Sequence, residues 1–135
     1  MKKIVAFGAS SSKSSINNTL ASFALSKVQD SVPIVLDLND FEMPIYSIDR
    51  EKKDGIPELA YRFKESLKKA DGIIISFAEH NGAYTVAFKN IFDWISRIEK
   101  VVWYNKPMFL LATSTGGNGA VIVLDIVVIV NLIIS

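Results

Sequence analysis

The stretch that decides the fold is Lys3-Ile4-Val5-Ala6-Phe7-Gly8-Ala9-Ser10-Ser11-Ser12-Lys13-Ser14-Ser15-Ile16-Asn17. An apolar segment leads into a loop with five serines in six positions, and the loop opens a helix. Hydroxyls and free backbone N–H groups beside the positive end of a helix suit a phosphate group. The loop has neither the Gly-Lys-Ser/Thr ending of nucleoside-triphosphate loops nor the Gly-x-Gly-x-x-Gly pattern of dinucleotide folds. Taken alone, it fits a phosphate site and a helix-capping turn equally well.

The composition indicates one domain over residues 1–135, long enough to bury about two thirds of its unfolded surface. The net charge is +1, and no basic block is present, so we expect no nucleic-acid partner. Cysteine is absent, which excludes disulfides and thiolate chemistry, and the single histidine, His80, argues against a metal site. The apolar run at the start is too short for a signal peptide, so we expect a cytoplasmic protein.

Four apolar segments read as continuous runs, which is typical of strands covered on both faces. They are residues 3–7, 34–38, 72–77 and 108–112. Helical spacing of apolar residues predicts three helices between them, and in the first the apolar positions are Ile16, Leu20, Phe23 or Ala24, and Val28. The alternation predicts an α/β fold, a doubly wound parallel sheet with helices on both faces.

In such sheets, ligands bind beyond the carboxyl ends of the strands. This rule selects three loops, residues 8–17, 78–84 and 113–119, and places the segment 39–55 at the same end. Three loops that meet at one crevice indicate a ligand site more strongly than any one motif does.

At these loops the chain resembles the NADPH-dependent FMN reductase family, flavodoxin-like enzymes that include chromate, quinone and azo-dye reductases. The family's first loop reads serine, any residue, arginine, two variable residues, serine, a hydrophobic residue and asparagine. The corresponding residues here are Ser10, Ser12, Ser15, Ile16 and Asn17. Ser12 replaces the arginine, and the neighbouring Lys13 can supply the charge. The resemblance implies that these residues hold the phosphate of FMN.

The second and third loops extend the resemblance. The segment 78–84 is similar to the family's proline-glutamate-tyrosine-asparagine-glycine-serine motif, and the helix at 89–97 matches its signature helix. The resemblance implies that the flavin ring lies against Ala78, Glu79, His80, Asn81, Gly82, Thr113, Thr115, Gly116 and Gly117. His80 stands where the family usually has tyrosine, so we expect it to stack on the ring without acid–base work.

The implied function is that of an oxidoreductase, a flavoprotein that takes a hydride from NAD(P)H onto FMN. A quinone, azo compound, metal oxyanion or free flavin then receives the electrons. The resemblance implies a homodimer or tetramer, no metal and no catalytic side chain, and we expect no membrane partner. Two alternatives stay open: an FMN-binding electron-transfer module without turnover, and a non-functional truncated fragment.

The tail over residues 121–135 does not fit this pattern. Twelve of its 15 residues are Val, Ile or Leu, and their β-branched density predicts a strand or an aggregation-prone edge instead of a helix. The run is short for a membrane span of about 20 residues. The resemblance implies a further helix, a fifth strand and a final helix, so we expect a C-terminally incomplete fold. A truncated chain, a shifted reading frame and misassigned sequence are the three explanations.

Overall fold

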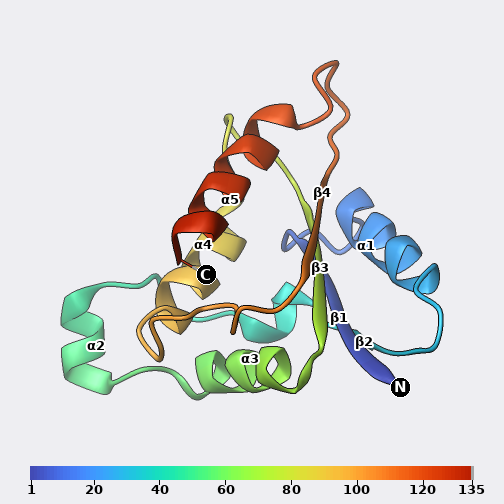
Figure 1. The fold of residues 1–135 in the computed structure, drawn as a ribbon. Helices are drawn as coiled ribbons and strands as arrows, with labels where there is room; N and C mark the ends of the chain where they lie inside the picture. Colours follow the sequence, from blue (N-terminus) through green and yellow to red (C-terminus); the bar gives the residue numbers. More distant parts are fainter. Residues whose placement is uncertain (135) are drawn as a thin grey trace.

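A computed structural model describes the backbone of residues 1–134 and places four parallel strands in one sheet of order β2-β1-β3-β4 (Figure 1). The elements are β1 Lys2–Ala9, α1 Ile16–Ser26, β2 Ser31–Val35, the 3-10 turn η1 Leu38–Phe41, α2 Ile48–Asp54, α3 Glu58–Lys69, β3 Gly72–Phe77, α4 Val86–Ile95, β4 Met108–Ala112 and α5 Val121–Ile134. Helices α3, α4 and α5 cover one face, and α1 covers the other (Figure 1). The predicted layered α/β fold is confirmed.

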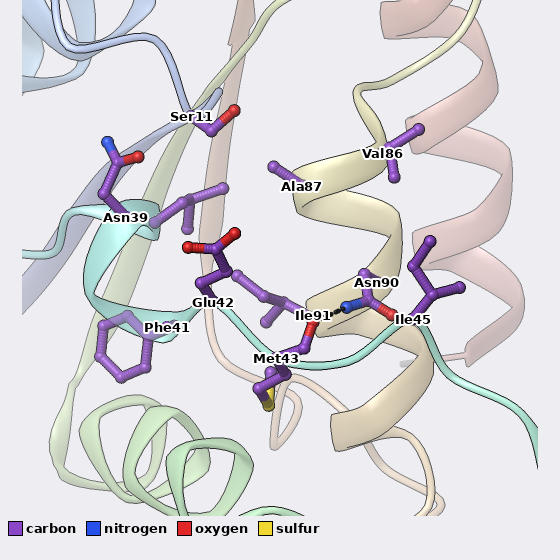
Figure 2. A pocket seen from close by; sticks show the side chains of 11 residues that line it. Ser11, Asn39, Phe41, Glu42, Met43, Ile45, Val86, Ala87, Asn90 and Ile91 are labelled. Atoms are coloured by element: carbon purple, nitrogen blue, oxygen red, sulfur yellow. Dashed lines mark hydrogen bonds between the residues drawn. The ribbon is translucent and has the colours of Figure 1, made fainter. Parts of the chain in front are cut away.

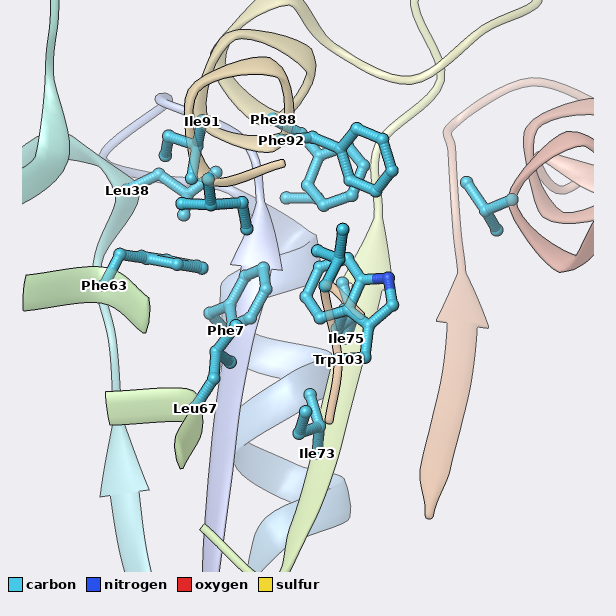
Figure 3. Close-up of a cluster of buried hydrophobic side chains, with 14 of the residues drawn as sticks. Phe7, Leu38, Phe63, Leu67, Ile73, Ile75, Phe88, Ile91, Phe92 and Trp103 are labelled. Carbon is cyan, nitrogen blue, oxygen red and sulfur yellow. The ribbon is translucent and has the colours of Figure 1, made fainter. Parts of the chain in front are cut away.

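The larger hydrophobic core lies between the sheet and the helices α3, α4 and α5 (Figure 3). Phe7 of β1 meets the edge of Phe63 of α3 at 5.4 Å between ring centroids, and Trp103 stacks parallel to Phe88 of α4. The core under α1 is much smaller and consists of Ala6, Ala21, Leu25 and Ile74 with their neighbours. Most of the buried apolar surface that stabilises the domain therefore lies on the α3–α5 face.

Gly8 allows α1 to begin directly against β1. A Cβ atom at this position would lie 2.1 Å from Oδ1 and 2.5 Å from the backbone N of Asn18. Real Cβ atoms do not approach other atoms so closely, so a larger residue would push the helix away from the strand. The glycine thus sets where the serine loop leaves the sheet.

The predicted apolar face of α1 is wrong in part. Ile16 and Phe23 are 47% and 58% exposed, whereas Ala24 packs against the core under the helix. The buried residues of α1 are Asn17, Ala21 and Leu25. Because the helix lies close to β1, a small side chain such as that of Ala21 fits between them better than a large one.

The strands at 72–77 and 108–112 lie where the apolar runs predicted them. The second strand occupies Ser31–Val35 instead of 34–38, with Pro33 inside it and opposite Ile4 of β1. Proline is tolerated there because β2 is an edge strand. The segment 39–55, expected to be a connection, contains η1 and α2. At the other edge, β4 pairs only with β3 among the described strands, as expected.

The predicted strand in the tail is also wrong, because residues 121–134 form the helix α5. Val123 and Val127 of this helix are buried in the larger core. β-branched residues cost a few tenths of a kcal/mol each in a helix, and burial of one such side chain offsets that by about 1.5 kcal/mol or more. Among the described residues, no helix is long and apolar enough to cross a bilayer.

Lys64 fastens α3 to the segment that precedes β4. Its buried Nζ donates hydrogen bonds to the carbonyls of Val101 and Val102, at 3.2 and 2.7 Å, and lies 3.8 Å from the centroid of the Tyr104 ring. Burial lowers the pKa of this ammonium group, and the charge of Glu99 acts in the opposite direction. Burial and a hydrogen bond to Glu99 raise the pKa of Tyr104 to about 12.

We predict that Lys64→Met lowers the free energy of unfolding by about 1–3 kcal/mol, because two carbonyls lose their charged donor. Urea denaturation followed by circular dichroism measures this change. Lys68→Met on the exposed side of the same helix is the matched control and should change stability little. Equal effects of the two substitutions would contradict a fastening role for Lys64.

Candidate functional site

The serine loop is shaped by its own hydroxyl groups. Ser10 is buried, and its Oγ accepts a hydrogen bond from the backbone N–H of Ser12 at 3.1 Å. Ser15 is the N-cap of α1, where its Oγ accepts from the N–H of Asn17 at 3.2 Å. The N–H of Ser15 donates to the carbonyl of Ser12. These bonds fold the loop back over the first turn of the helix.

The loop presents unpaired donors at its tip. Within the described part of the chain, the backbone N–H groups of Lys13, Ser14 and Ile16 bond to no other protein group. They lie at the positive end of an 11-residue helix. The exposed side chain of Lys13 has no ion-pair partner among the described residues. Converging N–H groups, a helix N-terminus and a free cation together suit a phosphate anion.

Asn17 faces into the protein. Its Oδ1 accepts a hydrogen bond from Oγ of Ser76 in β3 at 2.7 Å, and its Nδ2 donates to the carbonyl of Thr113 at 3.2 Å. The residue is 2% exposed. Its amide therefore joins α1 to the ends of β3 and β4, and the unpaired backbone donors of the loop lie at residues 13, 14 and 16.

The second loop is a tight turn. His80 and Ala83 exchange backbone hydrogen bonds at 2.8 and 3.1 Å, and the two residues between them, Asn81 and Gly82, have φ of 52° and 73°. Positive φ at both central positions is what a two-residue turn between antiparallel segments requires. The turn exposes His80 and Asn81 at the carboxyl end of the sheet, and Gly82 is half-buried.

Two side chains fix the second loop to its surroundings. Thr85, the N-cap of α4, donates its hydroxyl proton to the carbonyl of Ala9 at the end of β1, at 2.8 Å. Glu79 accepts a hydrogen bond from the N–H of Val123 in the first turn of α5, at 3.2 Å. A carboxylate at a helix N-terminus is favoured by the helix dipole. The second loop is therefore tied to both β1 and α5.

The third loop leaves the edge strand β4. The N–H of Thr113 donates to the carbonyl of Phe77 of β3, which extends the pairing of the two strands past β4. Beyond it, Thr115, Gly116 and Gly117 are exposed at the same end of the sheet as the serine loop. The structure thus places the three predicted loops at one end of the sheet and joins the first to the third through the hydrogen bond from Asn17 to Thr113.

Helix α4 holds the segment after η1, a role that the sequence analysis missed. Asn90 accepts a hydrogen bond from the N–H of Tyr46 at 2.8 Å and donates to the carbonyl of Met43 at 3.1 Å. The indole N–H of Trp94 donates to the carbonyl of Pro44 at 2.7 Å. The signal was present in the sequence, because both side chains belong to the signature helix at 89–97.

The sheet order and the helices on both faces of the sheet define a flavodoxin-like fold. The chain belongs to the NADPH-dependent FMN reductase family, which matches residues 2–132.

Two curated relatives match shorter parts of the chain. A 2-hydroxy-1,4-benzoquinone reductase from Burkholderia sp is 37% identical over 81 residues, which cover 59% of this chain and 43% of the relative. An NADPH azoreductase from Bacillus sp. (strain OY1-2) is 33% identical over 85 residues, 63% of this chain and 45% of the relative. The chain thus matches less than half of the length of these two relatives.

The solved structure of FerB, a flavoenzyme NAD(P)H:(acceptor) oxidoreductase from Paracoccus denitrificans, superposes with a TM-score of 0.80 at 25% identity. The superposition covers all of this chain and 73% of the FerB chain. The FerB chain therefore contains the equivalent of this four-stranded domain and extends beyond it.

We predict that Ser76→Ala lowers the free energy of unfolding by about 1–3 kcal/mol, because it leaves the buried Oδ1 of Asn17 without a donor. Hydrogen exchange should accelerate at the amides near Thr113, because the side chain of Asn17 also donates a hydrogen bond to the carbonyl of Thr113. Ser26→Ala at the exposed end of α1 is the control. Unchanged exchange near Thr113 would show that the bridge does not hold the third loop.

Proposed function

We propose that the crevice binds FMN and that the chain acts as an NAD(P)H-dependent oxidoreductase. The observation that carries this proposal is the set of three unpaired N–H groups at residues 13, 14 and 16, beside the free cation of Lys13. The single phosphate of FMN suits a loop with unpaired N–H donors beside a cation. The family to which the chain belongs supports the same cofactor.

The residues divide into two groups. In this proposal Ser10, Ser12, Lys13, Ser15, Ile16 and Asn17 form the phosphate site, in which Lys13 and the backbone N–H groups contact the phosphate. The amide of Asn17 supports the loop through its bonds to Ser76 and Thr113. The ring lies between the second and third loops, against Ala78, Glu79, His80, Asn81, Gly82, Thr113, Thr115, Gly116 and Gly117. When bound, FMN supplies the capacity to accept a hydride from reduced nicotinamide and to pass electrons to a small acceptor. The loops hold and orient the ring, and no side chain serves as a proton donor.

The acceptor is a small molecule in this proposal. Relatives named quinone reductase and azoreductase support a quinone or an azo compound, and we also propose a metal oxyanion or free flavin as acceptor. We also propose a homodimer or tetramer in the cytoplasm. The exposed Ile16 and Phe23 on the outer face of α1 offer apolar surface for a subunit contact.

Steady-state oxidation of NADPH tests the activity. We expect the chain reconstituted with FMN to oxidise NADPH when 1,4-benzoquinone is present. Bound flavin without turnover would identify an electron-transfer module and contradict the reductase proposal. Failure to bind FMN would contradict the cofactor assignment itself.

We predict that Lys13→Met weakens the binding of FMN by about tenfold or more, because a charge-assisted hydrogen bond to the phosphate is lost. Riboflavin has no phosphate, so its affinity should stay unchanged. Quenching of flavin fluorescence on titration measures both constants. Lys27→Met just beyond the other end of α1 is the matched control. An equal loss of affinity for FMN and riboflavin would show that Lys13 does not contact the phosphate.

A further inference from the structure

A cavity lies between the segment that follows β2 and the first turns of α4 (Figure 2). Its volume is about 400 Å³. Its walls come from η1, from residues 42–45 and from the helix between Val86 and Ile91. Of the three loops of the proposed flavin site, it includes only Ser11. Small-molecule sites usually measure roughly 300–1,000 Å³, so the cavity is large enough for a ligand of one or two rings.

The cavity has one charged acceptor in its wall. Figure 2 shows the carboxylate of Glu42, an exposed residue, directed toward the space between Ser11 and Ala87. In the described part of the chain, this carboxylate has no hydrogen-bond or ion-pair partner. The hydroxyl of Ser11 and Oδ1 of Asn39 are neutral acceptors of the same wall. The amide of Asn90 is already bonded to the segment around Met43.

The remaining wall is apolar and open to a ligand. Ile45 and Val86 are 66% and 71% exposed, and both line the cavity. Figure 2 shows them on the same side, across from Asn39. Ala87 is small and leaves the space between Glu42 and the helix free. Because Asn90 and Trp94 fasten residues 43–46 to α4, the two walls are held at a fixed separation.

We propose that this cavity binds a one- or two-ring aromatic molecule that carries a hydrogen-bond donor, a phenol or an aromatic amine. The donor bonds to the carboxylate of Glu42, and the ring packs against Ile45 and Val86. An anionic ligand is disfavoured because it meets the charge of Glu42. A ligand with acceptors alone, such as a quinone, places its lone pairs against the same charge. Binding here does not require FMN, so the site goes beyond the proposed function.

The probe pair 2-naphthol and 2-methoxynaphthalene tests the proposal, because the two share a ring system and differ in the donor. We expect saturable chemical-shift changes at amides around Asn39 and Ala87 when the isotope-labelled full chain is titrated with 2-naphthol. 2-Methoxynaphthalene should bind at least tenfold more weakly. Equal affinity for the two probes, or shifts located elsewhere, would overturn the assignment.

Substitutions test whether Glu42 accepts the hydrogen bond from the ligand. Glu42→Gln should weaken 2-naphthol about tenfold, whereas Asp40→Asn on the neighbouring turn should have no effect. Ala87→Leu fills the cavity and should abolish binding of both probes, with thermal melts used to verify folding. FMN affinity should be unchanged in Glu42→Gln, so loss of naphthol binding is distinguishable from failure of the flavin site. Unaltered affinity of Glu42→Gln for 2-naphthol would overturn the proposal. A change in the oligomeric state of Glu42→Gln would also overturn it, because the cavity would then be a contact between subunits.

Discussion

The buried amide of Asn17 is the interaction on which the crevice depends. One side chain reaches Ser76 at 2.7 Å and the carbonyl of Thr113 at 3.2 Å, and so joins α1, β3 and the end of β4. Loops at the carboxyl end of a parallel sheet leave separate strands and share no backbone ladder that would hold them together. Thr85 and Glu79 add tethers to β1 and α5. These hydrogen bonds join the three loops to one another and to α5 without the help of a ligand.

The same bridge explains why the helix that carries the serine loop has its small side chains inward. An asparagine side chain reaches β3 only if the helix lies close to the sheet, and Gly8 provides that proximity. Close packing then leaves room for Ala21 beneath the helix and directs Phe23 outward. Gly8, the inward amide of Asn17 and the outward ring of Phe23 are therefore all linked to the short distance between α1 and the sheet.

Where the chain gives a continuous apolar run bounded by glycine or proline, as at 72–77 and 108–112, the strands could be predicted to the residue. The rule that ligands lie at the carboxyl ends of strands also located all three loops. The direction of the Asn17 amide could not be predicted, since its partners lie 59 and 96 residues away and an asparagine bonds equally well to a phosphate. The helix α5 was missed because residue preferences carry no information about the core that buries Val123.

The position of each loop in the sheet has a dynamic consequence. The serine loop and the second loop follow β1 and β3, which pair on both sides, whereas the third loop follows β4, which pairs with β3 alone among the described strands. Loops on an edge strand move more freely on the nanosecond to microsecond scale than loops on central strands. We therefore expect the first two loops to be stiffer than the third. A ligand held by all three would then cost little ordering entropy at the first two, and most of the ordering would take place around residues 115–119.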